Sequence, residues 1–236
     1  MKKLWLLCFL CFAASWSVSC QPTVDLPSTV TGAPIAGANY AIPHYSRPVT
    51  VEDDNLRPFN DGLSLELKEL EQVILYPDNW SGPADLSARI KLIYGDKHLY
   101  LAAEVRDDEI GYAGHPGDWS GDAVNFFLKT ETEEGVREFL FKFSCQGTRY
   151  VYFERKSYNG EEYLWGSSWA SRRPEGYLVK AAIPFRDLGL LHPEESRIWL
   201  NASVEDDQQT AYLMLRGQTE GFLNDPEWIP AAFGQK

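Results

Sequence analysis

The 236-residue chain is poor in cysteine and methionine, and its four histidines lie far apart. Of the four cysteines, Cys8 and Cys11 lie in the N-terminal apolar segment, so that only Cys20 and Cys145 follow it. Two cysteines cannot build the disulfide framework that holds many small secreted domains together. The remainder of the chain must therefore be stabilised by a hydrophobic core, for which its length suffices.

Signatures of common enzymes are also absent. The sequence has no G-x-S-x-G elbow, no P-loop, no Rossmann fingerprint and no His-rich metal motif. Positive charge is scarce, since 22 Lys and Arg stand against 34 Asp and Glu, which gives a net charge of −12. Because such a surface repels phosphate backbones and anionic headgroups, we expect no nucleic-acid partner. Neutral polar ligands and cations remain compatible with the charge.

The first 19 residues have the pattern of a signal peptide. Two lysines precede an apolar segment over residues 4–14, which is too short to span a bilayer as a helix. The segment Ser17–Cys20 follows and resembles a lipobox, in which the cysteine is acylated and becomes the new N-terminus. Ser17 stands where most lipoboxes carry Leu, and ordinary signal-peptide cleavage is the alternative. We expect lipid on Cys20, which would anchor the protein to a bacterial outer membrane or cell surface.

Residues 20–39 are rich in Pro, Thr, Ala and Gly and show no apolar periodicity. This composition predicts a flexible tether between the membrane and the folded part of the protein. Residues 40–236 would then form one domain.

Alternation of apolar and polar residues with period two dominates residues 40–236. The segments Ala88–Tyr94 and His98–Arg106 alternate in this way, and Gly95-Asp96 between them predicts a hairpin. Leu63–Leu75 fits either a short amphipathic helix or a strand. Further strands are predicted at Val124–Leu128, Phe139–Phe143, Arg149–Arg155, Tyr177–Ile183, Ile198–Val204 and Ala211–Arg216. Short strands separated by turns predict an all-β fold, an antiparallel β-sandwich of immunoglobulin-like or jelly-roll type.

Acidic residues gather where predicted strands end. The clusters are Asp107-Asp108-Glu109, Asp118 with Asp122, and Glu205-Asp206-Asp207. Carboxylates in such loops can chelate Ca²⁺ through roughly six to eight oxygens, so a structural Ca²⁺ ion held by Asp107, Asp108 and Asp122 is one expectation. Solvated turn residues are the plainer interpretation, because no cluster has the spacing of a known calcium loop. A glycosidase would use paired carboxylates from the same clusters, but nothing selects an acid and a nucleophile.

Several segments carry a more specific pattern. In chain order they are Val49–Asp54, Asp85–Arg89, Tyr94–Leu101, Val105–Asp108, GYLVKAAIPF at 176–185 with Leu188–Leu190, and Asn224–Pro226 with Phe233-Gly234. Together with Trp119–Asn125 they resemble the family 9 carbohydrate-binding modules and related DOMON-like sandwiches, whose pattern at the fifth segment is G-Y-x-V-E-A-A-I-P-[WF]. The resemblance runs through most of the domain and implies a β-sandwich that binds carbohydrate without catalysing a reaction.

The resemblance also implies particular ligand contacts. In the family, a tryptophan before the strand W-x-x-D-x-V-E stacks on a sugar ring, and the Glu of that strand hydrogen-bonds sugar hydroxyls. Trp119 occupies the first position, whereas Asn125 replaces the Glu. Asn can still donate and accept hydrogen bonds, but it lacks the charge that strengthens them. Strand alternation places Asn125 opposite to Val124 and Phe126, hence away from the core.

Further contacts are implied at three positions. Lys142 alternates with core-type phenylalanines, in the region where family members place a basic ligand contact. Some members close an aromatic clamp with a second tryptophan near the C-terminal Asp-Pro segment. Here Trp228 follows Asp225-Pro226 and Phe222 precedes it, so that either ring could serve.

The sequence therefore predicts a lipid-anchored, non-catalytic protein that binds a polysaccharide or oligosaccharide for glycan capture or degradation, alongside other glycan-utilisation proteins. Three alternatives remain open. Some relatives with this fold bind haem through Met or His, and here only Met1, Met214 and four scattered histidines are available. Modules of this family also accompany glycoside hydrolases. A sandwich of this type could instead bind a partner protein.

Overall fold

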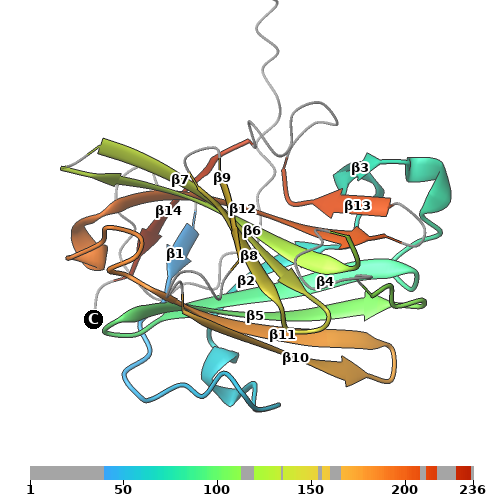
Figure 1. Cartoon of the computed structure of the whole chain (residues 1–236), viewed down its shortest axis with the longest axis horizontal. Helices are drawn as coiled ribbons and strands as arrows, with labels where there is room; N and C mark the ends of the chain where they lie inside the picture. Colours follow the sequence, from blue (N-terminus) through green and yellow to red (C-terminus); the bar gives the residue numbers. More distant parts are fainter. Residues whose placement is uncertain are drawn as a thin grey trace, which may run out of the picture.

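Two β-sheets packed face to face form the folded part of the chain in the computed structural model (Figure 1). The structure describes residues 40–112, 120–133, 135–153, 156–159, 166–207, 211–216 and 227–234. Across these ranges the elements are strands and short 3₁₀ turns, and none is a helix long and apolar enough to cross a membrane. The predicted all-β sandwich is confirmed.

The larger sheet has nine strands and the smaller sheet five. In the larger sheet the order is β1 (Tyr40–Ile42), β14 (Ile229–Phe233), β12 (Arg197–Asp206), β6 (Ala123–Thr132), β7 (Gly135–Ser144), β8 (Arg149–Phe153) and β9 (Lys156–Asn159). β13 (Ala211–Met214) pairs with the end of β12 that β14 does not reach, and β3 (Val73–Leu75) pairs with β13. In the smaller sheet the order is β10 (Ser167–Arg173), β11 (Gly176–Pro184), β5 (His98–Asp107), β4 (Leu86–Tyr94) and β2 (Leu63–Leu67). Among the described strands, all pairs are antiparallel except β1 with β14.

The predicted hairpin is confirmed, since β4 and β5 pair from Leu86 with Asp107 to Tyr94 with Leu99. For Leu63–Leu75, neither the helix nor a single strand is correct. The segment divides into β2 and β3, which belong to different sheets, with a 3₁₀ turn at Leu70–Gln72 between them. Gln72 stabilises this turn, because its side-chain oxygen accepts the backbone N–H groups of Lys68 and Glu69 at 2.8 and 3.0 Å.

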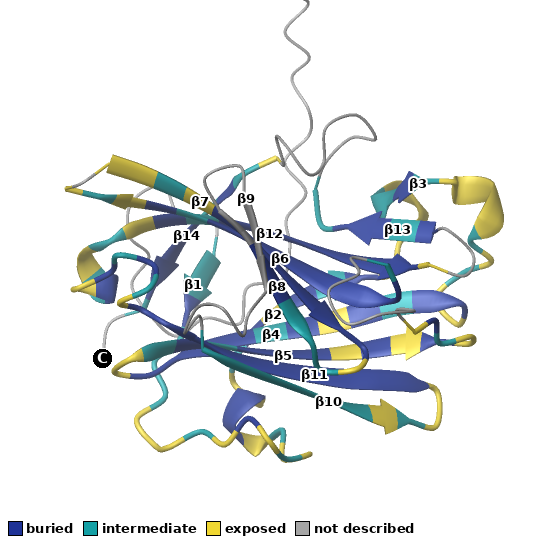
Figure 2. Cartoon of the chain, viewed as in Figure 1, coloured by how far each residue is buried: buried dark blue, intermediate teal, exposed yellow. Residues whose placement is uncertain are grey.

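The main core lies between the two sheets, where the alternating apolar side chains of both inner faces meet. The central strands of both sheets are accordingly coloured as buried along most of their length in Figure 2. On β7 the rings of Phe139, Phe141 and Phe143 stack in a row, with centroids 5.8 and 6.2 Å apart. Two smaller apolar clusters cover the outer faces of the sheets. One lies on the larger sheet and contains Ile74, Phe127, Leu140 and Met214. The other lies on the smaller sheet and contains Phe59, Ile93 and Ala102.

The start of β11 tolerates only glycine. Gly176 has φ +136°, and a Cβ at this position would lie against the carbonyl oxygen of Val105 on the neighbouring strand β5. Gly82 has a similar φ of +126°, but a Cβ there would meet nothing within 4 Å. Both glycines therefore have a backbone conformation that other residues rarely adopt, but only Gly176 also lacks space for a Cβ atom.

We predict that Gly176→Ala destabilises the fold more than Gly82→Ala. Both substitutions place Cβ in a glycine-only backbone region, at a cost of about 1–3 kcal/mol. Gly176→Ala also pushes a methyl group into the β5 backbone, which adds about 1–3 kcal/mol. Urea denaturation of the two variants measures the difference in unfolding free energy. Equal losses would contradict the close approach of β11 to β5.

Candidate functional site

Polar side chains from three adjacent strands meet on the outer face of the larger sheet. Asn125 on β6 lies opposite Lys142 on β7 and opposite Ser203 on β12. Val124 and Phe126, the neighbours of Asn125, belong to the core between the sheets. The prediction that Asn125 and Lys142 point away from this core is therefore confirmed.

A hydrogen-bonded network joins these side chains to Glu205 on β12. The Lys142 ammonium forms an ion pair with the Glu205 carboxylate. The Asn125 amide donates to Glu205 Oε2 at 3.3 Å and to Ser203 Oγ at 3.2 Å. The Tyr212 hydroxyl on β13 donates to Glu205 as well. The network therefore spans four neighbouring strands and holds each member in a fixed position.

The network is almost inaccessible to solvent. Asn125, Lys142 and Glu205 are 2%, 4% and 4% exposed. Burial raises the pKa of the Glu205 carboxyl, and the Lys142 ammonium opposes that shift. Since few water molecules can screen the charges, the hydrogen bonds among these groups are stronger than they would be at an open surface.

Trp228 lies on the same outer face. Its half-buried ring packs against the cluster of Ile74, Phe127, Leu140 and Met214, and Phe127 is two residues from Asn125 along β6. The Lys129 ammonium lies 5.1 Å from the centroid of the Trp228 ring. A cation thus already occupies one face of the ring. The other predicted aromatic contacts, Trp119 and Phe222, lie outside the described residues, as does the lipidation candidate Cys20.

Glu205 and Tyr212 belong to this site, although no sequence motif selects them. In the sequence, Glu205 stands among the acidic residues at the end of a predicted strand. Its alternation with Val204, a core residue, was the available indication that it faces outward. The pairing of β12 with β6, which brings Glu205 to Asn125, has no local signal in the sequence.

A second polar cluster lies at the end of the sandwich, where Asp107 and Asp122 come together. They are 3% and 0% exposed. The Asp122 carboxylate accepts the backbone N–H groups of Gly111 at 2.5 Å and Asp207 at 2.9 Å. Asp107 Oδ1 accepts the N–H of Glu109 at 3.0 Å, and the Asp107 carboxyl is hydrogen-bonded to that of Asp122.

Burial first, and the neighbouring Asp122 charge second, raise the pKa of Asp107 to about 8. Burial also raises the pKa of Asp122. A protein that buries two carboxyls so close together must keep a proton between them or neutralise them with a cation.

The predicted Ca²⁺ site is only partly assembled. Asp107 and Asp122 are neighbours, but Asp108 is exposed. Among the described residues, no group of three or more His, Cys, Asp or Glu side chains has the arrangement that holds a metal ion. The two buried carboxyls of Asp107 and Asp122 are of the ligand type that Ca²⁺ prefers, and Ca²⁺ binding at this end of the sandwich stays a proposal.

A separate open groove lies over the smaller sheet. None of the described residues that line it is aromatic, and most are charged. They include Asp54, Glu66, Lys68, Arg89, Glu104, Arg106, Arg173 and Glu175. A groove without a ring offers no platform for the apolar face of a ligand, so the outer face of the larger sheet is the stronger candidate.

We predict that, in the presence of a chelator, the unfolding free energy falls as the pH rises from about 4 to about 8. The folded state holds the Asp107 proton more tightly than the unfolded state does, so this stabilisation is complete at low pH and is lost through that window. The slope contributed by one such group is at most about 1.4 kcal/mol per pH unit. Urea denaturation across this pH range measures the slope.

Asp107→Asn is the control for this prediction, since an amide cannot ionise. We expect a flatter pH profile for the variant than for the wild type. If Ca²⁺ is bound, adding it at pH 8 should raise the melting temperature of the wild type and not that of the variant. Identical pH profiles for the two proteins would contradict the assignment to Asp107.

Comparison with known proteins identifies the fold and the family. Two solved structures of a family 9 carbohydrate-binding module from Caldicellulosiruptor kristjanssonii are similar to this chain. The structure in complex with cellotriose has a TM-score of 0.59 at 15% identity, covering 84% of this chain and 94% of the module. The structure in complex with glucose has a TM-score of 0.59 at 17% identity, covering 82% and 96%.

At such identities these similarities establish the fold alone. A search of curated proteins gives no match. The family model, in contrast, matches residues 68–218, which is more than half of the chain and includes Asn125, Lys142 and Glu205. The chain belongs to the carbohydrate family 9 binding domain-like family.

Proposed function

We propose that this protein is a non-catalytic, carbohydrate-binding lipoprotein that holds a saccharide on the outer face of its larger sheet. The observation that carries the proposal is the network of Asn125, Lys142 and Glu205 on that face. Sugar hydroxyls both donate and accept hydrogen bonds. The network offers an amide oxygen and a carboxylate that accept and an ammonium that donates.

Glu205 supplies the carboxylate that the family pattern has at position 125 and that Asn125 lacks. The family pattern places a Glu at position 125, and this chain has an uncharged amide there. Glu205 lies on the adjacent strand β12, with Oε2 3.3 Å from the Asn125 amide nitrogen. The face therefore keeps a carboxylate next to the position that the family uses, and hydrogen bonds from hydroxyls to a charged acceptor are the stronger ones.

Aromatic rings supply the second half of the proposed site. A pyranose presents an apolar face of C–H groups, which an aromatic ring covers while the hydroxyls stay free to bond. We assign the main stacking contact to Trp119, on the family pattern. Trp228 lies on the same face as Asn125 and is our candidate for a second stacking ring. Phe222 is the alternative.

The ligand class follows from charge and from the relatives. A net charge of −12 favours neutral saccharides over anionic ones. The similar module from Caldicellulosiruptor kristjanssonii was solved with cellotriose and with glucose. These two sugars are therefore the first to test.

The proposal includes a location at the cell surface, where a lipid on Cys20 anchors the protein and residues 20–39 act as a tether. A domain on such a tether would capture glycan close to the membrane and could work beside other glycan-utilisation proteins. Labelling with a fatty-acid analogue, which should be lost in Cys20→Ser, tests the anchor.

We predict that Trp119→Ala weakens binding of cellotriose at least about tenfold, which corresponds to about 1.4 kcal/mol. Asn125→Ala should weaken binding similarly, because sugar hydroxyls lose the amide oxygen as an acceptor and Glu205 loses the amide donor that positions it. Isothermal titration calorimetry measures both affinities, and a glycan array extends the search to other saccharides.

Trp169→Ala is the matched control, since this half-buried tryptophan lies on β10 of the other sheet. It should bind as the wild type does. Each variant is checked for a wild-type circular dichroism spectrum before titration. A wild type and Trp119→Ala that both bind no saccharide, or turnover of a polysaccharide by the purified protein, would refute the proposal.

A further inference from the structure

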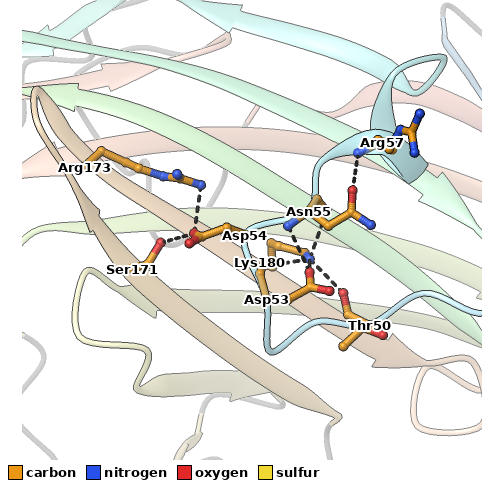
Figure 3. Close-up of polar contacts among 8 residues, drawn as sticks. All are labelled: Thr50, Asp53, Asp54, Asn55, Arg57, Ser171, Arg173 and Lys180. Carbon is orange, nitrogen blue, oxygen red and sulfur yellow. Dashed lines mark hydrogen bonds and ion pairs between the residues drawn. The ribbon is translucent and has the colours of Figure 1, made fainter.

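Lys180 lies in an unusual place for a lysine. It is on β11, where its neighbours Val179 and Ala181 face the core between the sheets. The Lys180 side chain therefore points to the outer face of the smaller sheet, yet it is 0% exposed. Residues 50–55 cover it and supply its polar partners (Figure 3).

Four oxygens surround the Lys180 ammonium. The distances from Nζ are 2.7 Å to Thr50 O, 3.0 Å to Asp53 O, 2.6 Å to Asp53 Oδ1 and 3.2 Å to Asn55 O. Three of these oxygens are main-chain carbonyls, and all four come from residues 50–55 (Figure 3). We call this arrangement the oxygen cage.

The oxygen cage has the composition of a cation site. Main-chain carbonyls and one carboxylate from a short loop are the donors that Ca²⁺ prefers in proteins. An ammonium has three protons, so four acceptors exceed what it needs. Converging carbonyl dipoles repel one another, and a buried cation at their centre offsets that repulsion.

The ammonium reaches the oxygen cage from a position where the family pattern has an acid. Residues 176–185 follow G-Y-x-V-E-A-A-I-P-[WF], except that Lys180 stands in place of Glu. A carboxylate at position 180 would add two oxygens to the four already present. The converging oxygens would then have no cation among them. A cation from solution would then offset the repulsion among these oxygens.

We propose that Lys180 is the resident cation of the oxygen cage, and that the cage binds a calcium-type divalent cation when a carboxylate replaces this ammonium. In the wild type the loop is thus held without a metal ion. The Lys180 hydrogen bond lowers the pKa of the Asp53 carboxyl, which agrees with a carboxylate that serves as a cation ligand.

A separate attachment keeps the loop close to the sheet when the ammonium is removed. Asp54 Oδ1 accepts a hydrogen bond from Ser171 Oγ at 2.7 Å and forms an ion pair with Arg173 at 2.9 Å (Figure 3). Both partners lie on β10. The oxygens of the cage therefore remain near position 180 in a Lys180 variant.

The test compares Lys180→Glu and Lys180→Met with the wild type, using CaCl₂ as the probe. In a chelator, both variants should melt several degrees below the wild type. Lys180→Glu should bind one more Ca²⁺ than the wild type by calorimetry and should recover most of its melting temperature with Ca²⁺. Lys180→Met should show neither change, because it adds no oxygen.

Lys97→Glu is the control, since it makes the same charge change at an exposed turn outside the oxygen cage. Any Ca²⁺ at Asp107 and Asp122 contributes equally to all these proteins and cancels in the comparison. If Lys180→Glu does not fold in a chelator, refolding on addition of Ca²⁺ is followed by circular dichroism. A Ca²⁺ stoichiometry equal to that of the wild type, or no refolding with Ca²⁺, would overturn the proposal.

Discussion

The central strands of the larger sheet are buried on both faces, so a polar side chain on these strands must find its hydrogen-bond partners within the protein. On the inner face, β6, β7 and β12 contribute only apolar side chains along most of their length. On the outer face, Asn125, Lys142 and Glu205 are nearly inaccessible to solvent. Each polar atom there needs a partner, because an unpaired buried charge costs roughly 3–5 kcal/mol. The ion pair between Lys142 and Glu205 meets that need and fixes both side chains in advance of any ligand, which reduces the entropy lost on binding.

Two lysines are buried in the part of the chain that the structure describes, and they show two ways of holding a cation. Lys142 is paired with a side chain, Glu205, whose carboxylate can exchange one donor for another when a ligand arrives. Lys180 is held mainly by main-chain carbonyls, which cannot move without a change in the loop. The first arrangement suits a binding face and the second suits a structural support. The outer faces of the two sheets thus hold their buried ammonium groups in different ways.

Much of this architecture could be predicted from local pattern. Alternation with period two located most strands and gave the correct outward direction for Asn125 and Lys142. It failed for Leu63–Leu75, where a side-chain interaction of Gln72 makes a turn inside an apparently continuous amphipathic segment. Contacts between distant segments could not be predicted. Asn125 and Glu205 are 80 residues apart in sequence, and Lys180 and Asp53 are 127 apart. Such contacts depend on sheet order, which a single sequence does not encode locally.

The central claim is that saccharide binds at the outer face of the larger sheet, and nuclear magnetic resonance tests it most directly. Titration of the ¹⁵N-labelled protein with cellotriose should shift the side-chain amide of Asn125 and backbone amides of β6, β7 and β12, while amides of β4 and β5 stay unchanged. Shifts confined to the charged groove over the smaller sheet, around Arg89 and Glu104, would contradict the account.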